Sequence, residues 1–294
     1  MSRRLDGILL VDKPPGITSA GVVRQVKRGL HADKVGHLGT LDPFASGLLP
    51  LALGEGAKIV PYLNQEEKSY VGTIALGRAT DTLDSTGEST ESAAIPTLGA
   101  SILEETARNF RGEIEQVPPM FSALKRAGVP LYELARKGIE VERAPRKIRI
   151  QSLSLELAAE NAIALSVRCS KGTYVRSLAR DIALALGTVG HLSSLRRTAF
   201  GPFSVAEAIP LDGIAPGIDL PLLSPRQALR GFGELEVGDL IAAELRRGEQ
   251  RGLASLPGPE AADDVAKVLG ARGELVAIVG AAATRWKILR VFAR

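Results

Sequence analysis

Cysteine and histidine are scarce in this chain, which has one cysteine, Cys169, and three histidines among its 294 residues. A single cysteine excludes an internal disulfide bond and favours a reducing compartment. The histidines do not lie at metal-ligand spacing with Cys169 or with one another, so we expect neither a structural nor a catalytic zinc site. Long apolar runs are missing too, since GILLV at residues 7–11 is too short for a signal peptide and no segment is long enough to span a membrane. The sequence therefore predicts a cytoplasmic protein.

The motifs of nucleotide-binding enzymes are also absent. No GxGxxG follows an expected strand, and no GxxxxGK followed by Ser or Thr occurs, so neither a dinucleotide cofactor nor a nucleoside triphosphate is predicted. Strand and helix patterns alternate too irregularly for a doubly wound parallel sheet, which favours an α+β fold. We therefore expect chemistry that needs no cofactor and no metal.

Charge is modest in total but uneven along the chain. Lysine and arginine total 37 against 33 aspartate and glutamate, a formal net charge of +4, which is weak evidence for a nucleic-acid partner. Between residues 117 and 150, three glutamates oppose a set of basic residues, which are Lys125, Arg126, Arg136, Lys137, Arg143, Arg146, Lys147 and Arg149. Such a stretch is either a solvated helical face or a phosphate-binding surface.

Apolar periodicity places the expected strands and helices. Short apolar or alternating runs predict strands at residues 7–11, 46–54, 69–77 and 162–170, and helical spacing predicts helices at 97–110 and 174–187. A further helix follows Thr18 or Ser19, either of which can cap its first turn. Residues 215–233 are rich in proline and glycine, which indicates a linker. The pieces ELVAIVG and WKILRVF after it are typical of a small β-rich module.

One acid stands out because its surroundings are apolar. The stretch GHLGTLDPFASGLLP, residues 36–50, holds Asp42 directly before a proline, with no lysine or arginine in the stretch to neutralise it. Alone, an Asp-Pro pair indicates a helix cap or an Asx-turn. Tyr70, Tyr174 and Arg176 lie in segments whose simplest individual interpretation is likewise core packing or an exposed helix face. A functional interpretation needs the segments taken together.

Taken in order, these segments resemble the motifs of the TruB-type tRNA pseudouridine synthases of bacteria. The matching stretches, between residues 5 and 203, are KPPGITS, GHLGTLDPFASGLLP, KSY, RGEIEQVPPMFSALK, CSKGTYVRSLARDI and HLSSLRR. The resemblance implies a pseudouridine synthase catalytic domain at residues 1–230, with a mixed, largely antiparallel sheet and with residues 117–150 as a basic RNA-clamping loop. It also implies a PUA-like RNA-binding domain at residues 231–294.

The resemblance implies a role for individual side chains as well. Asp42 would be the catalytic nucleophile and Arg176 would pair with it, while Tyr70 would pack against the target uracil and take part in catalysis. His37 would occupy the space that the flipped base leaves. The remaining substrate-binding and RNA-binding residues would be Tyr174, Leu195, Lys125, Arg126 and Lys147. The implied substrate is uridine 55 in the T arm of tRNA, and the implied enzyme works as a monomer with no guide RNA and no protein partner.

The chemistry of pseudouridine formation fits the residues independently. The reaction breaks the C1′–N1 bond of uridine, turns the base and rejoins it through C5, so it needs a carboxylate but no redox cofactor, nucleotide or metal. A cation beside Asp42 would keep this acid ionised in an apolar site. The carboxylate could attack C1′, attack the uracil ring or assist elimination to a glycal. Two other functions stay open: a non-catalytic tRNA-binding or tRNA-folding protein on the same scaffold, and a hydrolase that cleaves a nucleoside bond.

Overall fold

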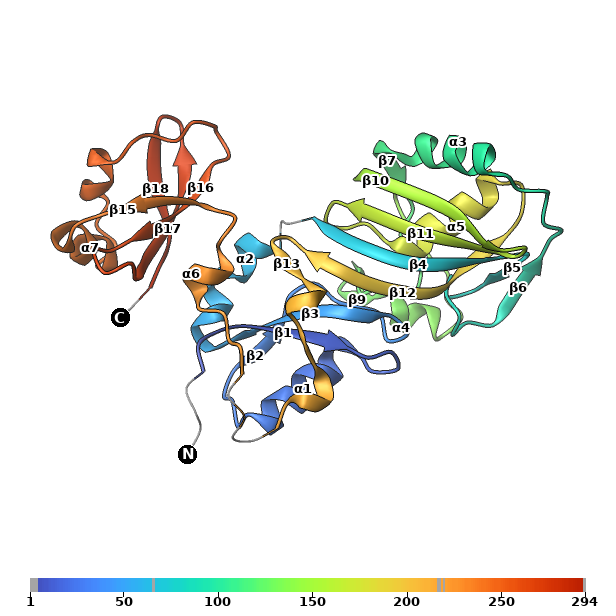
Figure 1. Ribbon diagram of the computed structural model, residues 1–294, viewed down its shortest axis with the longest axis horizontal. Coiled ribbons are helices and arrows are strands. Elements are labelled where there is room, and N and C mark those ends of the chain that lie inside the picture. The colour runs from blue at the N-terminus through green and yellow to red at the C-terminus, as the bar shows by residue number, and fades with distance from the viewer. Residues whose placement is uncertain (1–4, 65–66, 216–217, 219, 293–294) are drawn as a thin grey trace.

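The computed structural model describes residues 5–64, 67–215, 218 and 220–292, and most strands in this part of the chain belong to one large sheet (Figure 1). Its strands are β1 (Gly7–Lys13), β2 (Val35–His37), β3 (Ser46–Leu53), β4 (Lys68–Leu76), β7 (Gly112–Gln116), β10 (Arg146–Ala159), β11 (Ala162–Cys169), β12 (Gly190–Phe200), β13 (Phe203–Ser204) and β14 (Ile209–Pro210). The order across the sheet is β14-β1-β3-β12-β4-β11-β10-β7, with β2 beside β3 and β13 beside β12. Within the described residues of this sheet, only β1 with β14 and β3 with β12 pair in parallel, which confirms the predicted mixed, largely antiparallel sheet.

Helices connect and cover these strands. The α-helices are α1 (Ser19–Gly29), α2 (Val60–Leu63), α3 (Ala100–Phe110), α4 (Leu131–Ala135), α5 (Val175–Ala185), α6 (Pro225–Ala228) and α7 (Asp239–Arg246). The 3-10 helices are η1 (Gly54–Ile59), η2 (Val205–Glu207), η3 (Leu211–Gly213) and η4 (Arg251–Ser255). Over the described residues, no helix is both long enough and apolar enough to cross a membrane.

Local residues set the ends of the helices that the sequence predicts. Thr18 caps α1, since its side chain accepts a hydrogen bond of 2.9 Å from the amide of Gly21. Gly187 follows α5 with a φ of 80°, a left-handed conformation that glycine adopts at little cost. Helix α3 begins at Ala100 and not at residue 97 as predicted, because Leu98 precedes the helix and packs against the core while Gly99 takes the N-cap position.

The continuous apolar runs of β1 and β3 are explained by burial on both faces. Alternate residues of β1, such as Leu9 and Val11, pack with α1, whereas Ile8 and Leu10 pack with η1 and α2 on the other side. Strands buried on both faces lose the alternation of polar and apolar residues. The largest core cluster lies where α3 and α5 pack on β4, β10 and β11, and the arrangement of these elements is visible in Figure 1.

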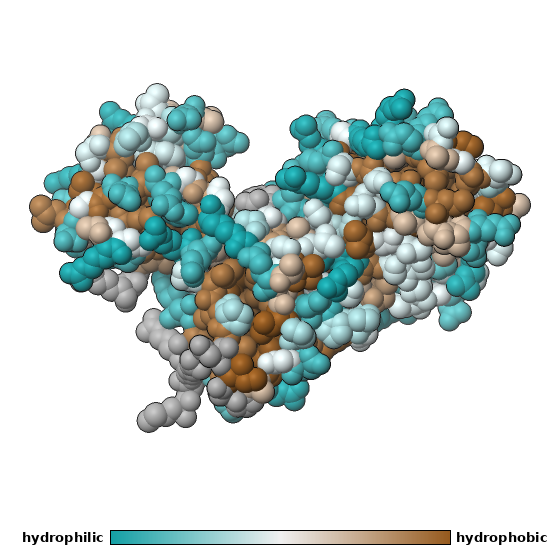
Figure 2. Space-filling model, in the orientation of Figure 1, coloured by the Kyte–Doolittle hydropathy of each residue, from teal (hydrophilic) through white to brown (hydrophobic). Residues whose placement is uncertain are grey.

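A second, smaller sheet follows the main one in the chain. It contains β15 (Gly233–Glu236), β16 (Val265–Leu269), β17 (Leu275–Ala282) and β18 (Arg285–Val291) in that order, and with α7 it encloses its own apolar core. Ile278 and Phe292 of this unit pack into a cluster with Ile8 and Phe200 of the main sheet. The surface is indented between this unit and the part of the main sheet that carries α3 (Figure 2). The expected linker contains α6, and three of its residues, 216, 217 and 219, lie outside the described residues.

The basic stretch is more ordered than the predicted clamping loop. Residues 117–150 contain a short hairpin of β8 (Lys125–Arg126) and β9 (Val129–Pro130), helix α4, and the first residues of β10. The start of β10 is a strand because Ile148 and Ile150 alternate with Lys147 and Arg149, so that one face of it is apolar and buried. A further hairpin pairs β5 (Arg78–Thr80) with β6 (Ser89–Ser92) at the far end of the sheet.

Candidate active site

Asp42 lies in the loop between β2 and β3, and this loop is tied to the N-terminal segment. The hydroxyl of Ser19 accepts a hydrogen bond from the amide of Leu41 and donates one to its carbonyl, both 2.9 Å long. The buried ammonium of Lys13 donates to three carbonyls, those of Pro14, Ile17 and Pro43, at 2.9, 2.9 and 3.2 Å. Burial lowers the pKa of Lys13 to about 8, against the opposing effect of the nearby Asp42 carboxylate. The loop therefore holds Asp42 in a fixed place.

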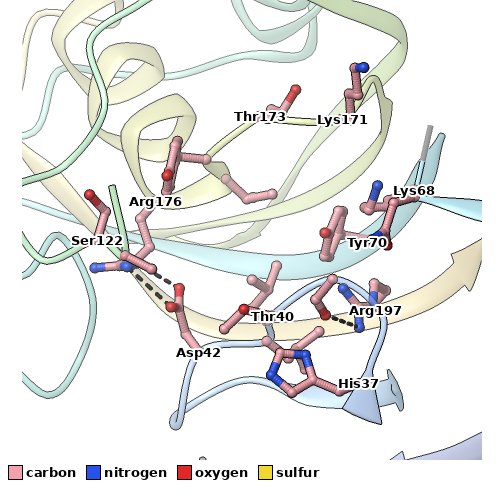
Figure 3. Close-up of a pocket in the computed structure, with 18 residues that line it drawn as sticks. His37, Thr40, Asp42, Lys68, Tyr70, Ser122, Lys171, Thr173, Arg176 and Arg197 are labelled. Carbon is pink, nitrogen blue, oxygen red and sulfur yellow. Dashed lines mark hydrogen bonds and ion pairs between the residues drawn. The ribbon is translucent and has the colours of Figure 1, made fainter. Parts of the chain in front are cut away.

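Asp42 forms an ion pair with Arg176, which lies in the first turn of α5. Nε of Arg176 donates to Oδ2 of Asp42 at 2.8 Å and Nη2 donates to Oδ1 at 3.2 Å, a bidentate pair between residues 134 apart in the sequence (Figure 3). The guanidinium is 5% exposed and the Asp42 side chain is 34% exposed. The pair thus buries its cation and presents its anion.

The other donors of Arg176 bind two loops and a second acid, which has no distinguishing mark in the sequence. Nη1 donates to the carbonyl of Thr82 and Nη2 to that of Phe121, both at 2.8 Å. Nη1 also lies 3.5 Å from Oδ2 of the buried Asp84, whose Oδ1 accepts hydrogen bonds from the Thr82 and Thr86 hydroxyls. In the sequence Asp84 stands in a polar stretch, TDTLDSTGE, which indicates only a loop.

The N-terminus of α5 is held by the last residue of β7 and by the residue that follows it. Nε2 of Gln116 donates to the carbonyl of Tyr174 at 3.1 Å, and the amide of Tyr174 donates to Oε1 of Gln116 at 2.8 Å. The hydroxyl of Ser177 donates to the carbonyl of Val117 at 3.0 Å. The chain then runs to Ser122, whose side chain is buried. These contacts between residues 116–122 and the start of α5 place Tyr174 and Ser122 beside Arg176.

These elements enclose a cavity of about 530 Å³. All six of the residues expected in the catalytic and uracil-binding site line it, namely His37, Asp42, Tyr70, Tyr174, Arg176 and Leu195. Figure 3 shows Asp42 and Arg176 on one side of the cavity and His37, Tyr70 and Arg197 on the other. Lys68, Ser122, Lys171 and Arg197 also line it, and none of them is marked as a site residue by the sequence.

The aromatic side chains of the cavity are uncharged at pH 7. Burial raises the pKa of the Tyr70 phenol above its usual value of 10, so this side chain stays protonated. Burial and the charge of Arg197 lower the pKa of His37 below 6.5, so its imidazole is uncharged, and its buried Nδ1 has no partner. Burial likewise raises the pKa of Tyr174. Uncharged aromatic faces are suited to contact with a nucleobase.

The structure brings together only part of the expected RNA-binding set. Lys125 and Arg126 lie on β8 at a second cavity of about 400 Å³, which Arg143 also lines, and Nη1 of Arg126 donates to the carbonyl of Glu142 at 2.8 Å. Lys147 on β10 does not line this cavity, although its neighbour Arg146 does. Its exposed ammonium forms an ion pair of 3.0 Å with Glu113 of β7, which also raises its pKa. In the described residues, no group of three or more histidine, cysteine, aspartate or glutamate side chains is placed to hold a metal ion.

Two family models match this chain. The model described as TruB family pseudouridylate synthase, N-terminal domain, matches residues 27–175, and the tRNA pseudouridylate synthase B C-terminal domain matches residues 176–217. The chain belongs to the TruB family of pseudouridylate synthases. The TruB models include the Asp42 loop, β4 with Tyr70, and α5 with Arg176, and they end before the smaller sheet begins at Gly233.

Individual TruB relatives and solved structures agree with this membership. A tRNA pseudouridine synthase B of Hydrogenovibrio crunogenus is 48% identical over 227 residues, 75% of this chain and 75% of the relative. That of Geotalea uraniireducens is 51% identical over 208 residues, 71% of this chain and 67% of the relative. A chain from the crystal structure of a Cbf5–Nop10–Gar1 complex superposes with a TM-score of 0.75 and 26% identity, covering 98% of this chain and 85% of that chain. This TruB chain therefore has the pseudouridine synthase fold.

Proposed function

We propose that this pseudouridine synthase acts on uridine 55 in the T arm of tRNA and that Asp42 is its nucleophile. The bidentate pair of Asp42 and Arg176 carries the proposal, because it presents a carboxylate to a cavity while its cation stays buried. An opposite charge in contact favours the ionised form of an acid that is partly removed from water. The named activity of the relatives, tRNA pseudouridine synthase B, supports tRNA as the substrate.

The proposed reaction rearranges bonds within one nucleotide. The C1′–N1 bond breaks, and its electron pair stays on the uracil ring. The ring turns, C5 forms a bond to C1′, the proton on C5 leaves, and N1 gains a proton, so no atom is added or lost overall. Negative charge develops on the ring whether the Asp42 carboxylate attacks C1′, adds to the ring or removes a proton in forming a glycal. A cavity that excludes bulk water favours rejoining over hydrolysis.

The remaining cavity residues bind the base. A uridine inside folded RNA must be unstacked before it reaches Asp42, at a cost of a few kcal/mol. Stacking on the ring of Tyr70 returns roughly 1–3 kcal/mol of that cost. Tyr174 and Leu195 bound the same cavity, and the uncharged imidazole of His37 is suited to fill the space that the uracil leaves in the RNA stack. These roles follow from position in the cavity and from the aromatic or apolar character of each side chain.

Two other parts of the chain are proposed to bind tRNA outside the cavity. Lys125 and Arg126 on the β8–β9 hairpin, together with Lys147, supply positive charge for phosphates of the T arm. We divide the chain into a catalytic domain at residues 1–230 and a PUA-like RNA-binding domain at 231–294. The support for the division is that the second sheet has its own core, and exposed cations on β18, Arg285 and Arg290, fit an RNA partner.

The proposed enzyme works as a monomer in the cytoplasm, without guide RNA or protein partner. Its support is the presence, on one chain, of a base-binding cavity and a basic hairpin, which together recognise both the target uracil and the surrounding phosphates. The one cysteine is a buried free thiol, as expected of a protein from a reducing compartment.

The test compares the wild type with Asp42→Asn on an unmodified tRNA transcript, and it maps pseudouridine by position. Asparagine keeps the size of the side chain and can form the same Asx-turn, but it is far less nucleophilic. We expect wild-type product at position 55 only and no detectable product from Asp42→Asn, with tRNA affinity little changed. The matched control is Asp12→Asn, because Asp12 forms a bidentate pair with Arg196 outside this cavity, at 3.0 and 2.7 Å. Normal product from Asp42→Asn would leave only a tRNA-binding or tRNA-folding role.

A further inference from the structure

Arg197 is a buried cation for which the reaction outlined above gives no role. Its side chain is fully buried in β12, where Nε donates to the carbonyl of Leu48 at 2.7 Å and Nη2 to that of Gly39 at 3.0 Å. The guanidinium also lies 5.3 Å from the centre of the Phe200 ring. Among the described residues, no carboxylate forms an ion pair with it, whereas Arg176 faces two. A buried charge without a counter-ion lowers the stability of the fold, so a function of Arg197 is needed to explain why a cation is kept at this position.

The free end of Arg197 lies beside Tyr70. Nη1 is buried and, among the described residues, no acceptor lies within normal hydrogen-bond geometry of it, although a hydrogen bond from the Arg197 side chain contributes to the pKa of Tyr70. The side chain lines the cavity. Arg197 and Tyr70 are direct partners in the register of β12 and β4, so both project from the same face of the sheet. Figure 3 shows them together on the side of the cavity opposite Asp42. The charge of Arg197 lowers the pKa of Tyr70 and opposes the effects of burial, Cys169 and Asp42.

A hydrogen bond between these two groups can have only one direction. A guanidinium has only N–H donors, whereas a phenol oxygen can both accept and donate. When Nη1 donates to the phenol oxygen, the proton of the phenol must therefore point elsewhere. The open direction is the cavity, because Tyr70 lines it. A phenol that accepts from a cation is also a stronger donor.

We propose that Arg197 is a positioning residue that holds the Tyr70 hydroxyl and turns its proton into the cavity, where Tyr70 donates a hydrogen bond to the uracil carbonyl oxygen that gains negative charge. The inference rests on the proposed function and assigns a second task to the aromatic ring that stacks on the base. When the C1′–N1 bond breaks, its electron pair spreads from N1 onto the ring carbonyls. The Tyr70 proton stays on the phenol oxygen throughout, and the charge leaves the ring when the bond from C5 to C1′ forms.

The first experiment measures the Tyr70 phenol and not the activity. Ultraviolet titration of tyrosinate is practical because the chain has four tyrosines, and Tyr70→Phe identifies the Tyr70 contribution. Arg197→Met keeps most of the length and removes the charge, so the pKa of Tyr70 should rise. Arg196→Met is the control, because it removes a charge from the adjacent residue, which pairs with Asp12. An unchanged Tyr70 pKa in folded Arg197→Met would refute the contact on which the proposal depends.

The second experiment is a double-mutant cycle in single-turnover pseudouridine formation with saturating enzyme. Loss of one such donor typically slows chemistry by about 10²–10³-fold. We expect Arg197→Met and Tyr70→Phe each to slow the reaction to that extent, with tRNA affinity unchanged, and Arg197→Lys to recover part of the rate. The double variant should be no slower than the slower single variant, because residues that act as a unit do not add. Rate losses that multiply would overturn the proposal and leave Arg197 a structural residue.

A replacement variant and a parallel measurement complete the test. If Arg197→Met does not fold, the cycle is made with Arg197→Lys, which retains the charge but loses the forked donor geometry. Asp42→Asn is measured alongside. Product from Asp42→Asn would remove the proposed function, whereas an inactive Asp42→Asn with multiplying losses at Arg197 and Tyr70 would remove this inference alone.

Discussion

Replacing Arg176 with lysine keeps one positive charge beside Asp42 and removes the forked donor geometry. Arg176 makes four hydrogen bonds of 3.2 Å or less, two to Asp42 and one each to the carbonyls of Thr82 and Phe121. A lysine ammonium is a single donor atom and cannot reach the carboxylate and both carbonyls at once. If it stays with Asp42, the two carbonyl bonds are broken. At ~1.5 kcal/mol for each hydrogen bond to a charged group, the variant should be less stable by about 3 kcal/mol.

The effect of Arg176→Lys on activity should exceed its effect on folding. If Asp42 is the nucleophile as proposed, a carboxylate held by one hydrogen bond should be displaced from its position for attack, and a displacement of ~1 Å costs roughly 10²-fold in rate. Thermal unfolding and single-turnover product formation test both parts. Arg180→Lys is the control, since Arg180 lies one turn along α5 and, in the described part of the chain, forms its ion pair with the neighbouring Asp181. Loss of such a pair should lower stability by ~0–1 kcal/mol. An Arg176→Lys variant as stable and as fast as this control would refute the reasoning.

Two further predictions concern charged residues outside the pair. Replacing Lys125, Arg126 and Lys147 with alanine should weaken tRNA binding and flatten its salt dependence. The slope of log K against log salt concentration should fall by ~0.7–0.9 for each phosphate that the variant no longer neutralises. An unchanged slope in binding titrations would mean that these residues are only solvated surface. The pKa of Lys13 falls from 10.5 to about 8 on folding. Between these two values the unfolded chain keeps a proton that the folded chain has released, so the free energy of unfolding should rise with pH above about 8. Urea unfolding should show the wild type gaining on Lys13→Met across this window, and a pH-independent difference would contradict the assignment.

The sequence predicts the elements of the fold where the cause of structure is local. The alternation in β4 and β11 and the helical spacing in α5 each follow from one buried face, and Thr18 and Gly187 mark helix ends by their own chemistry. The helical spacing predicts the start of α3 too early. Leu98 fits the apolar spacing and packs against the core, but it precedes the first residue of the helix. The strand at 146–150 is hidden in the sequence because its basic residues suggest a loop, even though Ile148 and Ile150 alternate with them.

The site is predictable only in part, because its contacts join distant segments. The order of the motifs leads to Asp42, Tyr70 and Arg176, and the structure brings all three to one cavity. Asp84 and Arg197 have no comparable mark in the sequence, since a polar loop and a pair of adjacent arginines both suggest solvent exposure. Their burial depends on how β12 and the β5–β6 hairpin pack against the Asp42 loop, and no local pattern reports that packing.

Burial is divided unequally within the Asp42–Arg176 pair, and this division determines what the pair can do. The guanidinium is bound by carbonyls of two other segments and faces Asp84, so its position is set by contacts other than the one with Asp42. Asp42 is then oriented before any substrate binds, and such preorganisation lowers the cost of reaching a transition state. The more exposed pair of Arg196 with Asp12 has the same bidentate geometry but a solvated cation. Because Arg176 comes from a helix 134 residues away, the pair forms only when the sheet and α5 are both in place, and the Asp-Pro turn alone cannot supply it.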